Sequence, residues 1–186
     1  MKVIVKKVTS WGDVLDSARF TQGKSPIDKE PSEKFKRDMI RAEHSPIRCL
    51  VFTMDFYDIP YYVSVHLCRH VHAQPFVSTS RPDRNGEVKP REAQLKSDPV
   101  NMRLWLNAQE IINISKVRLC NRAEAMTKRI WAEALYGLMF IDPVLAKACV
   151  PSCIHRGFCP EIEGCKAIEG QLFQAARDNY ISQLKG

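Results

Sequence analysis

The sequence predicts a mixed α/β (α+β) fold, in which a single domain spanning residues 1–186 combines a small sheet with long helices. Short runs of β-branched and aromatic residues lie in the first third of the chain, whereas the second half has apolar residues at helical spacing. A chain of 186 residues can bury one core, and its 45% apolar and 26% charged residues are ordinary for a globular domain. One domain that contains both kinds of element is therefore expected.

The first sixty residues are expected to hold two strands and two helices. Residues 2–8 alternate in polarity, and residues 50–57 are the clearest strand because β-branched and aromatic side chains dominate them. Ser10 or Asp13 can cap a first helix, since both side chains accept hydrogen bonds from backbone N–H groups. A second helix is expected over residues 32–42, after a loop that contains glycine and proline.

The rest of the chain is expected to be mainly helical. Pro60 fits the first turn of a helix that runs to about His70, and the polar residues 81–99 follow as a loop. Apolar side chains then recur at helical spacing over residues 100–140. This pattern fits one bent helix or two helices that are joined near Cys120.

The charge of the chain limits the classes of partner. The net charge is +7, from 28 Lys and Arg against 21 Asp and Glu, which fits a basic solubilising surface or a phosphate-bearing partner. The basic residues form no long tract, so a small phosphate-bearing ligand is favoured over a nucleic acid. No apolar run approaches the roughly 18 residues of a membrane span, and no hydrophobic signal region opens the chain. A cytoplasmic protein without a membrane partner is expected.

Residues 69–81 carry the densest set of chemical groups, with two arginines, two histidines, a glutamine and three hydroxyls in thirteen positions. Arginine presents a planar fork of donors that matches phosphate, and the hydroxyls add neutral hydrogen-bonding groups. Arg69 and His70 lie about one turn beyond His66 on the predicted helix, so the three side chains share one side of it. An anion-binding site is one interpretation, and a buried network of arginine–carboxylate pairs is the other.

Several segments in this part of the chain follow one another in a recognisable order. They are His44-Ser45-Pro46-Ile47, the strand Val51-Phe52-Thr53-Met54, Ile59-Pro60, Arg69-His70, Thr79 with Arg81, and then Asn113, Val117-Arg118 and Ala123. In order and spacing they resemble the flavin-dependent thymidylate synthases, over roughly residues 40 to 130. The resemblance implies a fold like that of the thymidylate synthase complementing proteins.

The resemblance also implies an activity. Members of this family methylate dUMP reductively, so dUMP or a related pyrimidine nucleotide is the expected substrate. Methylenetetrahydrofolate would donate the carbon and NADPH would be the reductant, with FAD bound between the subunits of a homotetramer. The protein would supply orientation and electrostatics, while the cofactor carries the hydride.

Site residues are carried over from the family by position. The roles that the resemblance implies are catalysis by Arg69, Thr79 and Arg118, flavin contacts from Arg69, His70 and Asn113, and nucleotide contacts from His66, Arg69, Thr79, Ser80, Arg81 and Arg118. The sequence departs from the family pattern at Val71, Cys49 and Pro82. Val71 replaces an arginine and Cys49 replaces a histidine, both of which the family places at the flavin.

These departures support a second interpretation, a flavin-free nucleotide-binding protein on the same scaffold, with altered or absent catalysis. A third interpretation is a nucleic-acid-binding protein that uses the +7 surface, with a cysteine-rich zinc module. Steep salt dependence of nucleic-acid binding would be required for it. The lack of a long basic tract disfavours this third interpretation.

The seven cysteines form no obvious disulfide framework, because their number is odd and no secretion signal is seen. Residues 149–165 form a cysteine-rich loop between a short helix that begins at Asp142-Pro143 and a final helix. Thiolates and an imidazole in such a loop suit structural zinc or, less often, an iron–sulfur cluster, with Cys153, His155, Cys159 and Cys165 as the predicted ligands. The alternative is a set of free cysteines packed as small hydrophobes. The three cysteines outside this loop, Cys49, Cys68 and Cys120, are expected in the core.

Overall fold

A computed structural model of the chain describes residues 1–79, 81, 84, 86 and 90–185. The strands are β1 (Lys2–Lys7), β2 (Val51–Pro60), β3 (Gln74–Val77) and β4 (Pro99–Asn107). The helices are α1 (Trp11–Phe20), α2 (Glu33–Arg41), α3 (Tyr61–Leu67), α5 (Ala108–Arg118), α6 (Ala125–Ile141), α7 (Pro143–Ala148), α8 (Ser152–Arg156) and α9 (Gln171–Lys185). Short 3-10 turns are η1 (Ser45–Cys49), η2 (Arg91–Ala93) and η3 (Ala167–Glu169). The mixed α/β fold class that the sequence predicts is therefore confirmed.

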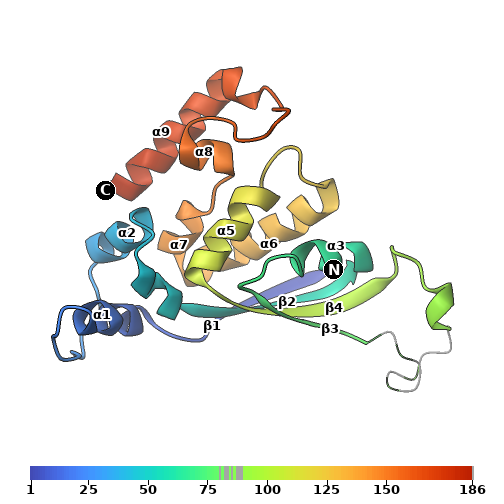
Figure 1. Cartoon of the computed structure of the whole chain (residues 1–186), viewed down its shortest axis with the longest axis horizontal. Coiled ribbons are helices and arrows are strands. Elements are labelled where there is room, and N and C mark those ends of the chain that lie inside the picture. Colours follow the sequence, from blue (N-terminus) through green and yellow to red (C-terminus); the bar gives the residue numbers. More distant parts are fainter. Residues whose placement is uncertain (80, 82–83, 85, 87–89, 186) are drawn as a thin grey trace.

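Among the described residues, four strands form one antiparallel sheet in the order β1-β2-β4-β3. The central strand β2 pairs with β1 on one side and with β4 on the other, and the short β3 lies at the edge. Figure 1 shows α3, α5 and α6 on one side of this sheet, with no helix on the opposite side among the described residues. The molecule thus has one covered and one uncovered sheet face.

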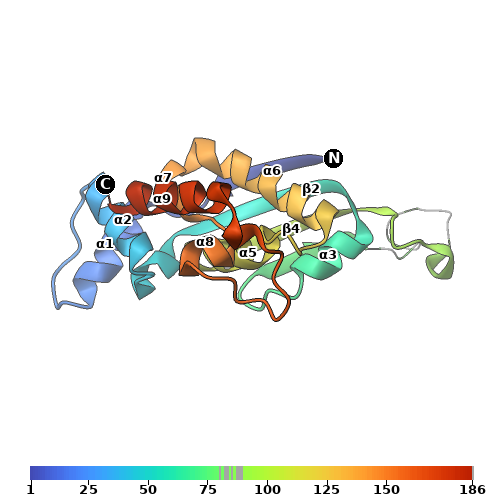
Figure 2. The same ribbon diagram turned by 90° about the horizontal axis from the view of Figure 1, so that it is seen from above.

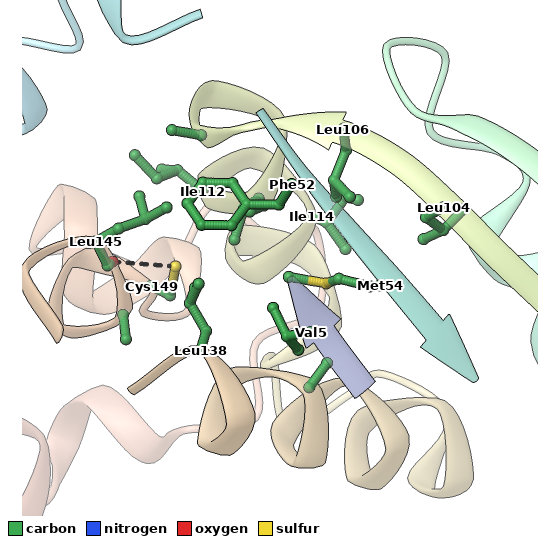
Figure 3. Packing of buried hydrophobic residues seen from close by; sticks show 14 of the residues in the cluster. Val5, Phe52, Met54, Leu104, Leu106, Ile112, Ile114, Leu138, Leu145 and Cys149 are labelled. Carbon is green, nitrogen blue, oxygen red and sulfur yellow. Dashed lines mark hydrogen bonds between the residues drawn. The ribbon is translucent and has the colours of Figure 1, made fainter. Parts of the chain in front are cut away.

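The hydrophobic core lies between the sheet and these helices. Inward-facing side chains of β2 and β4, such as Phe52, Met54 and Leu104, are fully buried and pack against apolar residues of α5 and α6 (Figure 3). Gly137 lets α6 approach the sheet closely, because a Cβ there would lie 3.1 Å from a methyl carbon of Val5. The close approach of α6 to β1 therefore depends on the missing side chain.

Polar side chains fix the helix starts that the sequence suggests. Ser10 caps α1 and forms a capping box with Asp13, and Ser32 caps α2 through the backbone N–H of Phe35. Asp142 caps α7, accepts a hydrogen bond from the Trp11 indole at 2.8 Å and pairs with Lys7 at 2.7 Å. The predicted strands near residues 2–8 and 50–57 and the two capped helices are confirmed.

The prediction of helix throughout residues 100–140 is wrong at its start, because residues 99–107 form the strand β4. Met102, Leu104 and Leu106 point into the core, whereas Arg103 and Trp105 point to the uncovered face. This alternation has the period of a strand. Beyond it, α5 and α6 are two separate helices, and their junction includes Cys120, as one of the two sequence interpretations has it.

The helix that follows Pro60 is shorter than predicted. It ends at Leu67 with Cys68 as its C-cap, so Arg69 and His70 lie in the turn beyond it and not on its surface. Tight turns tie this segment back to the helix, since the His70 N–H donates to the Leu67 carbonyl at 3.2 Å. The side-chain spacing expected for a continuous helix therefore does not apply to His70.

The C-terminal segment forms a layer farther from the sheet (Figure 1). Seen from above, α9 runs from the α8 end of the molecule toward α2 (Figure 2), and it contacts α2, α7 and α8. The cysteine-rich segment 149–165 contains the short helix α8 as well as loop. In the part of the chain that the structure describes, no helix is long and apolar enough to cross a membrane.

Candidate functional site

Arg118 connects the ends of two helices. It lies in the last turn of α5, where its Nη2 donates to the backbone oxygen of His66 at 2.6 Å and its Nε donates to His70 Nε2 at 3.0 Å. His66 lies in the last turn of α3, and His70 lies just beyond that helix. The guanidinium of Arg118 thus ties the turn that follows α3 to the C-terminal end of α5.

Burial and the positive charge of Arg118 together keep His70 neutral. Burial and the Arg118 charge lower the pKa of His70 to about 4. Burial also lowers the pKa of Arg118, and the exposed Arg69 nearby lowers it further. Because His70 Nε2 accepts from Arg118, the ring proton is assigned to Nδ1, which can donate to a ligand. Two arginines and a neutral imidazole donor therefore lie together here.

A chain of hydrogen bonds from Glu124 through Thr127 holds the ring of His66. Its Nδ1 lies 2.8 Å from the hydroxyl of the fully buried Thr127, and that hydroxyl donates to Glu124 Oε2 at 2.8 Å. Burial opposes ionisation of Glu124, but the backbone N–H groups of Met126 and Thr127 donate to the carboxylate, and its pKa is lowered overall. The ionised Glu124 accepts the hydrogen bond of the Thr127 hydroxyl, so the Thr127 oxygen in turn accepts from His66 Nδ1–H. The Nε2 atom of His66 then carries the lone pair and can accept a hydrogen bond.

The structure does not bring the second half of the predicted site into this cluster. Thr79 and Arg81 lie beyond the end of β3, and the backbone N–H of Arg81 donates to Thr79 Oγ1 at 3.2 Å. The backbone N–H of Ala73 donates to the His70 carbonyl, and the six steps from Ala73 to Thr79 span about 20 Å at the usual rise of a strand. Ser80 lies outside the described residues. One chain therefore holds the predicted nucleotide residues in two separate places.

Asn113, the predicted flavin contact on α5, faces away from Arg118. Five residues along a helix correspond to a turn of about 140°. Asn113 instead accepts from Gln109 Nε2 at 3.3 Å and donates to Glu110 Oε2 at 3.3 Å. Gln109 also donates to Glu43 at 2.5 Å, so Asn113 belongs to a different polar cluster.

The predicted metal ligands are divided between two places. Cys153, Cys159 and Cys165 line a small pocket together with Cys120, whereas His155 is held elsewhere. Its Nδ1 lies 3.0 Å from the Tyr180 hydroxyl and its Nε2 lies 3.3 Å from a Glu43 oxygen. Within the described ranges, no three His, Cys, Asp or Glu side chains are already arranged to hold a metal ion.

The prediction that the other three cysteines lie in the core is not supported. Cys68 is exposed, and Cys49 and Cys120 are only partly buried. The fully buried cysteine of the described chain is Cys149, whose pKa burial raises to about 12. Apolar neighbours in the sequence do not imply burial at the end of a helix, where the chain turns toward solvent.

The uncovered sheet face carries residues that the sequence interpretation missed. A groove of about 540 Å³ lies on it, lined by Asp55, Phe56, Tyr57, Phe76, Val77, Ser78, Asn101, Met102, Arg103 and Trp105. Phe76 is 61% exposed and Trp105 is 41% exposed, and Arg103 makes two bonds of 2.6 and 2.7 Å to Asp55. The alternating polarity of residues 99–107 is the signal that could have placed Arg103 and Trp105 on this face.

Solved structures with the same arrangement of elements are known. A crystal structure of the flavin-dependent thymidylate synthase ThyX from Helicobacter pylori, complexed with FAD and dUMP, superposes with a TM-score of 0.66 at 15% identity and covers 81% of this chain and 100% of that chain. The chain has the fold of the flavin-dependent thymidylate synthases. A second ThyX structure from the same organism with FAD and dUMP gives a TM-score of 0.68 at 16% identity and covers 81% and 99%.

A further structural neighbour is bound to a brominated dUMP. The UMP/dUMP methylase PolB from Streptomyces cacaoi, bound with 5-Br dUMP, gives a TM-score of 0.62 at 14% identity and covers 79% of this chain and 94% of that chain. No protein-family model matches the sequence, and no curated protein matches it in sequence. The thymidylate synthase fold is therefore shared with proteins whose sequences have diverged widely from this one.

Proposed function

We propose that the protein methylates a pyrimidine nucleotide, dUMP or a close relative, with methylenetetrahydrofolate as carbon donor, FAD as cofactor and NADPH as reductant. The observation that carries the proposal is the cluster of Arg69, His70 and Arg118 next to His66, on a fold shared with nucleotide-methylating enzymes. Two cations beside two imidazole rings suit the phosphate and the ring of a nucleotide. The fold alone would not support the activity, since one fold hosts many functions.

The cluster fits a flavin in part. Arg69 is exposed and can meet an anionic group of FAD, and His70 presents its Nδ1–H as a donor. Asn113 faces another cluster, and Val71, in the position where the family has an arginine, is 79% exposed. Arg69 and His70 are therefore the residues proposed to hold FAD, which would supply hydride transfer when bound.

His66 and Arg118 are proposed to act on the nucleotide. The relay from Glu124 through Thr127 holds the His66 ring and leaves Nε2 as an acceptor, which suits an N–H group of a pyrimidine ring. Arg118 positions His66 through its backbone oxygen and supplies positive charge beside it. Orientation of the substrate by fixed donors and acceptors is the contribution expected of the protein.

Thr79, Ser80 and Arg81 are proposed to complete the site from a second subunit of a homotetramer. Thr79 and Arg81 lie past the end of β3, beyond about 20 Å of extended chain that begins at Ala73, and this placement supports a shared site. The groove on the uncovered face supports it as well, because exposed aromatic side chains are common in protein interfaces and Ser78 at its end adjoins Thr79.

The test is the release of hydrogen from C5 of dUMP by the purified chain with FAD, NADPH and methylenetetrahydrofolate. The expected result is product formation that requires FAD, and flavin absorption that elutes with the protein. A colourless protein that does not bind added FAD, but does bind dUMP in calorimetry, would overturn the proposed reaction. It would support the second candidate, a flavin-free nucleotide-binding protein, which the exposed Val71 favours.

A further inference from the structure

Four cysteines meet where the end of α5 joins the C-terminal segment. Cys120 follows α5 by two residues, Cys153 lies in α8, and Cys159 and Cys165 lie in the loop before η3. All four line one pocket of about 50 Å³, which we name the cysteine pocket. Two segments more than thirty residues apart therefore bring four of the seven cysteines to one place.

The four side chains line the cysteine pocket at different depths. Cys120, Cys153 and Cys159 are partly buried, and Cys165 is exposed. The chain passes close to the Cys159 sulfur, since a Cβ at Gly164 would lie 3.3 Å from it. Zinc binds thiolates and not thiols, so binding of the ion displaces the thiol protons.

We propose that Cys120, Cys153, Cys159 and Cys165 bind one Zn²⁺ ion as a structural site. Four thiolates at about 2.3 Å in a tetrahedron are a standard structural zinc shell, with sulfur atoms about 3.8 Å apart. The four side chains of the described pocket are gathered but not yet in ligating positions. Deprotonation and side-chain rotation upon zinc binding draw them inward, because metal affinity is coupled to local folding.

The surroundings of the pocket suit a thiolate cluster of negative charge. Leu119, Pro151 and Ile168 supply apolar parts of the pocket lining, and Lys166 lines the pocket with a positive charge. Nearby, Arg122 and Glu163 face each other across 3.6 Å and link the same two segments. Apolar walls and a neighbouring cation both stabilise a closed zinc site.

His155, which the spacing alone placed among the ligands, is not one of them in this proposal. Both of its ring nitrogens face other groups, Tyr180 on one side and Glu43 on the other. Cys120 takes its place, although it lies on another segment of the chain. The zinc site thus fastens the C-terminal layer to the end of α5, two residues after Arg118.

The experiment is elemental analysis of the full chain, purified without a histidine tag. About one zinc per chain is expected, falling to below about 0.2 in Cys120→Ser and Cys159→Ser. The matched control Cys68→Ser removes an exposed cysteine outside the pocket and is expected to keep the zinc. His155→Ala is expected to keep it as well, which separates the two ligand sets.

A second measurement covers variants that fold poorly. Wild-type protein stripped with a chelator is titrated with Zn²⁺ alone against a chromophoric competitor, and with Co²⁺, which is expected to give the intense visible bands of tetrahedral thiolate coordination. Zinc below about 0.1 per chain together with no uptake of added Zn²⁺ would overturn the proposal. Bound iron with visible absorption would also overturn the proposal. So would a zinc content that is kept in Cys120→Ser and lost in His155→Ala, because this result would assign the ligand role to His155. These readouts do not depend on the proposed methylation activity.

Discussion

The two places that hold the predicted nucleotide residues differ in how they are built. Arg118, His66 and His70 lie where three helices meet, half-buried and fixed by hydrogen bonds within the chain. Thr79 and Arg81 lie past the edge strand β3, near a groove on the uncovered sheet face. The Arg118 cluster is held by hydrogen bonds within the chain, whereas Thr79 and Arg81 lie near an exposed sheet face that another chain can reach. The comparison teaches that one continuous sequence motif, residues 69–81, can contribute to two differently built parts of one chain.

Removing Arg118 is expected to have the largest effect. Arg118→Met keeps the volume of the side chain but loses two hydrogen bonds and the positive charge beside His70. Charge-assisted bonds of this kind contribute up to about 3 kcal/mol, so nucleotide affinity is expected to fall about 100-fold. Calorimetry with dUMP measures the loss. Arg129→Ala, on the exposed surface of α6, is the control and is expected to bind normally.

A mixing experiment tests whether the two places form one shared site. Arg118→Met and Arg81→Ala are each expected to be inactive, and co-expression of both chains is expected to restore activity. If each site takes Arg118 from one chain and Arg81 from another, each of these residues is intact in about half of the sites of a random mixture. About a quarter of the sites then keep both residues. No recovery in mixed oligomers, with both variants folded, would mean that Thr79 and Arg81 act within their own chain or not at all.

The Thr127 relay is expected to have a moderate effect. Thr127→Val keeps the shape of this fully buried side chain but removes the bond to His66 and one of the donors to Glu124. The free energy of unfolding is expected to fall by about 1–2 kcal/mol. Ring ¹⁵N chemical shifts of His66 should then show a mixture of tautomers. Thr127→Ser keeps the hydroxyl and is the matched control, in which a single Nδ1–H tautomer is expected.

The smallest expected effect is a pH dependence of stability from His70. Its pKa in the folded chain, about 4, lies below the ordinary 6.5, so the unfolded chain binds the proton more tightly. The folded state is then fully stabilised above about pH 6.5 and loses stability as the pH falls toward 4. Because the ring is only half-buried, the loss between pH 7 and pH 5 is expected to be about 1 kcal/mol.

Urea unfolding of wild type and of His70→Gln at both pH values measures this difference. The variant is expected to lose less stability than wild type between pH 7 and pH 5, since glutamine does not titrate. His72→Gln changes an exposed histidine nearby and is expected to follow wild type. Equal pH dependence in all three proteins would contradict the assignment of a depressed pKa to His70.

Local sequence signals predicted the elements that depend on local chemistry. The Ser10 and Ser32 caps and the strand β2 follow from single side chains and from short apolar runs, which act within a few residues. The sequence prediction places residues 100–107 in a helix because Leu104 also fits the helical spacing of the residues that follow. Hydrogen-bonded pairing with β2 makes this segment a strand, and β2 lies about fifty residues earlier in the sequence.

The site was harder to predict because its parts come together through long-range contacts. Arg118 and His70 were proposed from the resemblance, but the bond between them spans 48 residues. Glu124 and Thr127 act on His66 from another helix, and no spacing rule connects them. Cys120 escaped the predicted metal set for the same reason, since ligand-spacing rules consider neighbours along the chain and not neighbours in space.

The buried carboxylate of Asp142 has a consequence for the order of folding. It bonds to the Trp11 indole across 131 residues of sequence and pairs with Lys7, while it also caps α7. During synthesis, Lys7 and Trp11 therefore cannot form these contacts until about three quarters of the chain has been made. Contacts of such separation slow folding, because the intervening chain must be closed into a loop first. The strand β1 can pair with β2 once residue 60 has been made, whereas the Lys7 and Trp11 contacts to Asp142 form only after most of the chain is present.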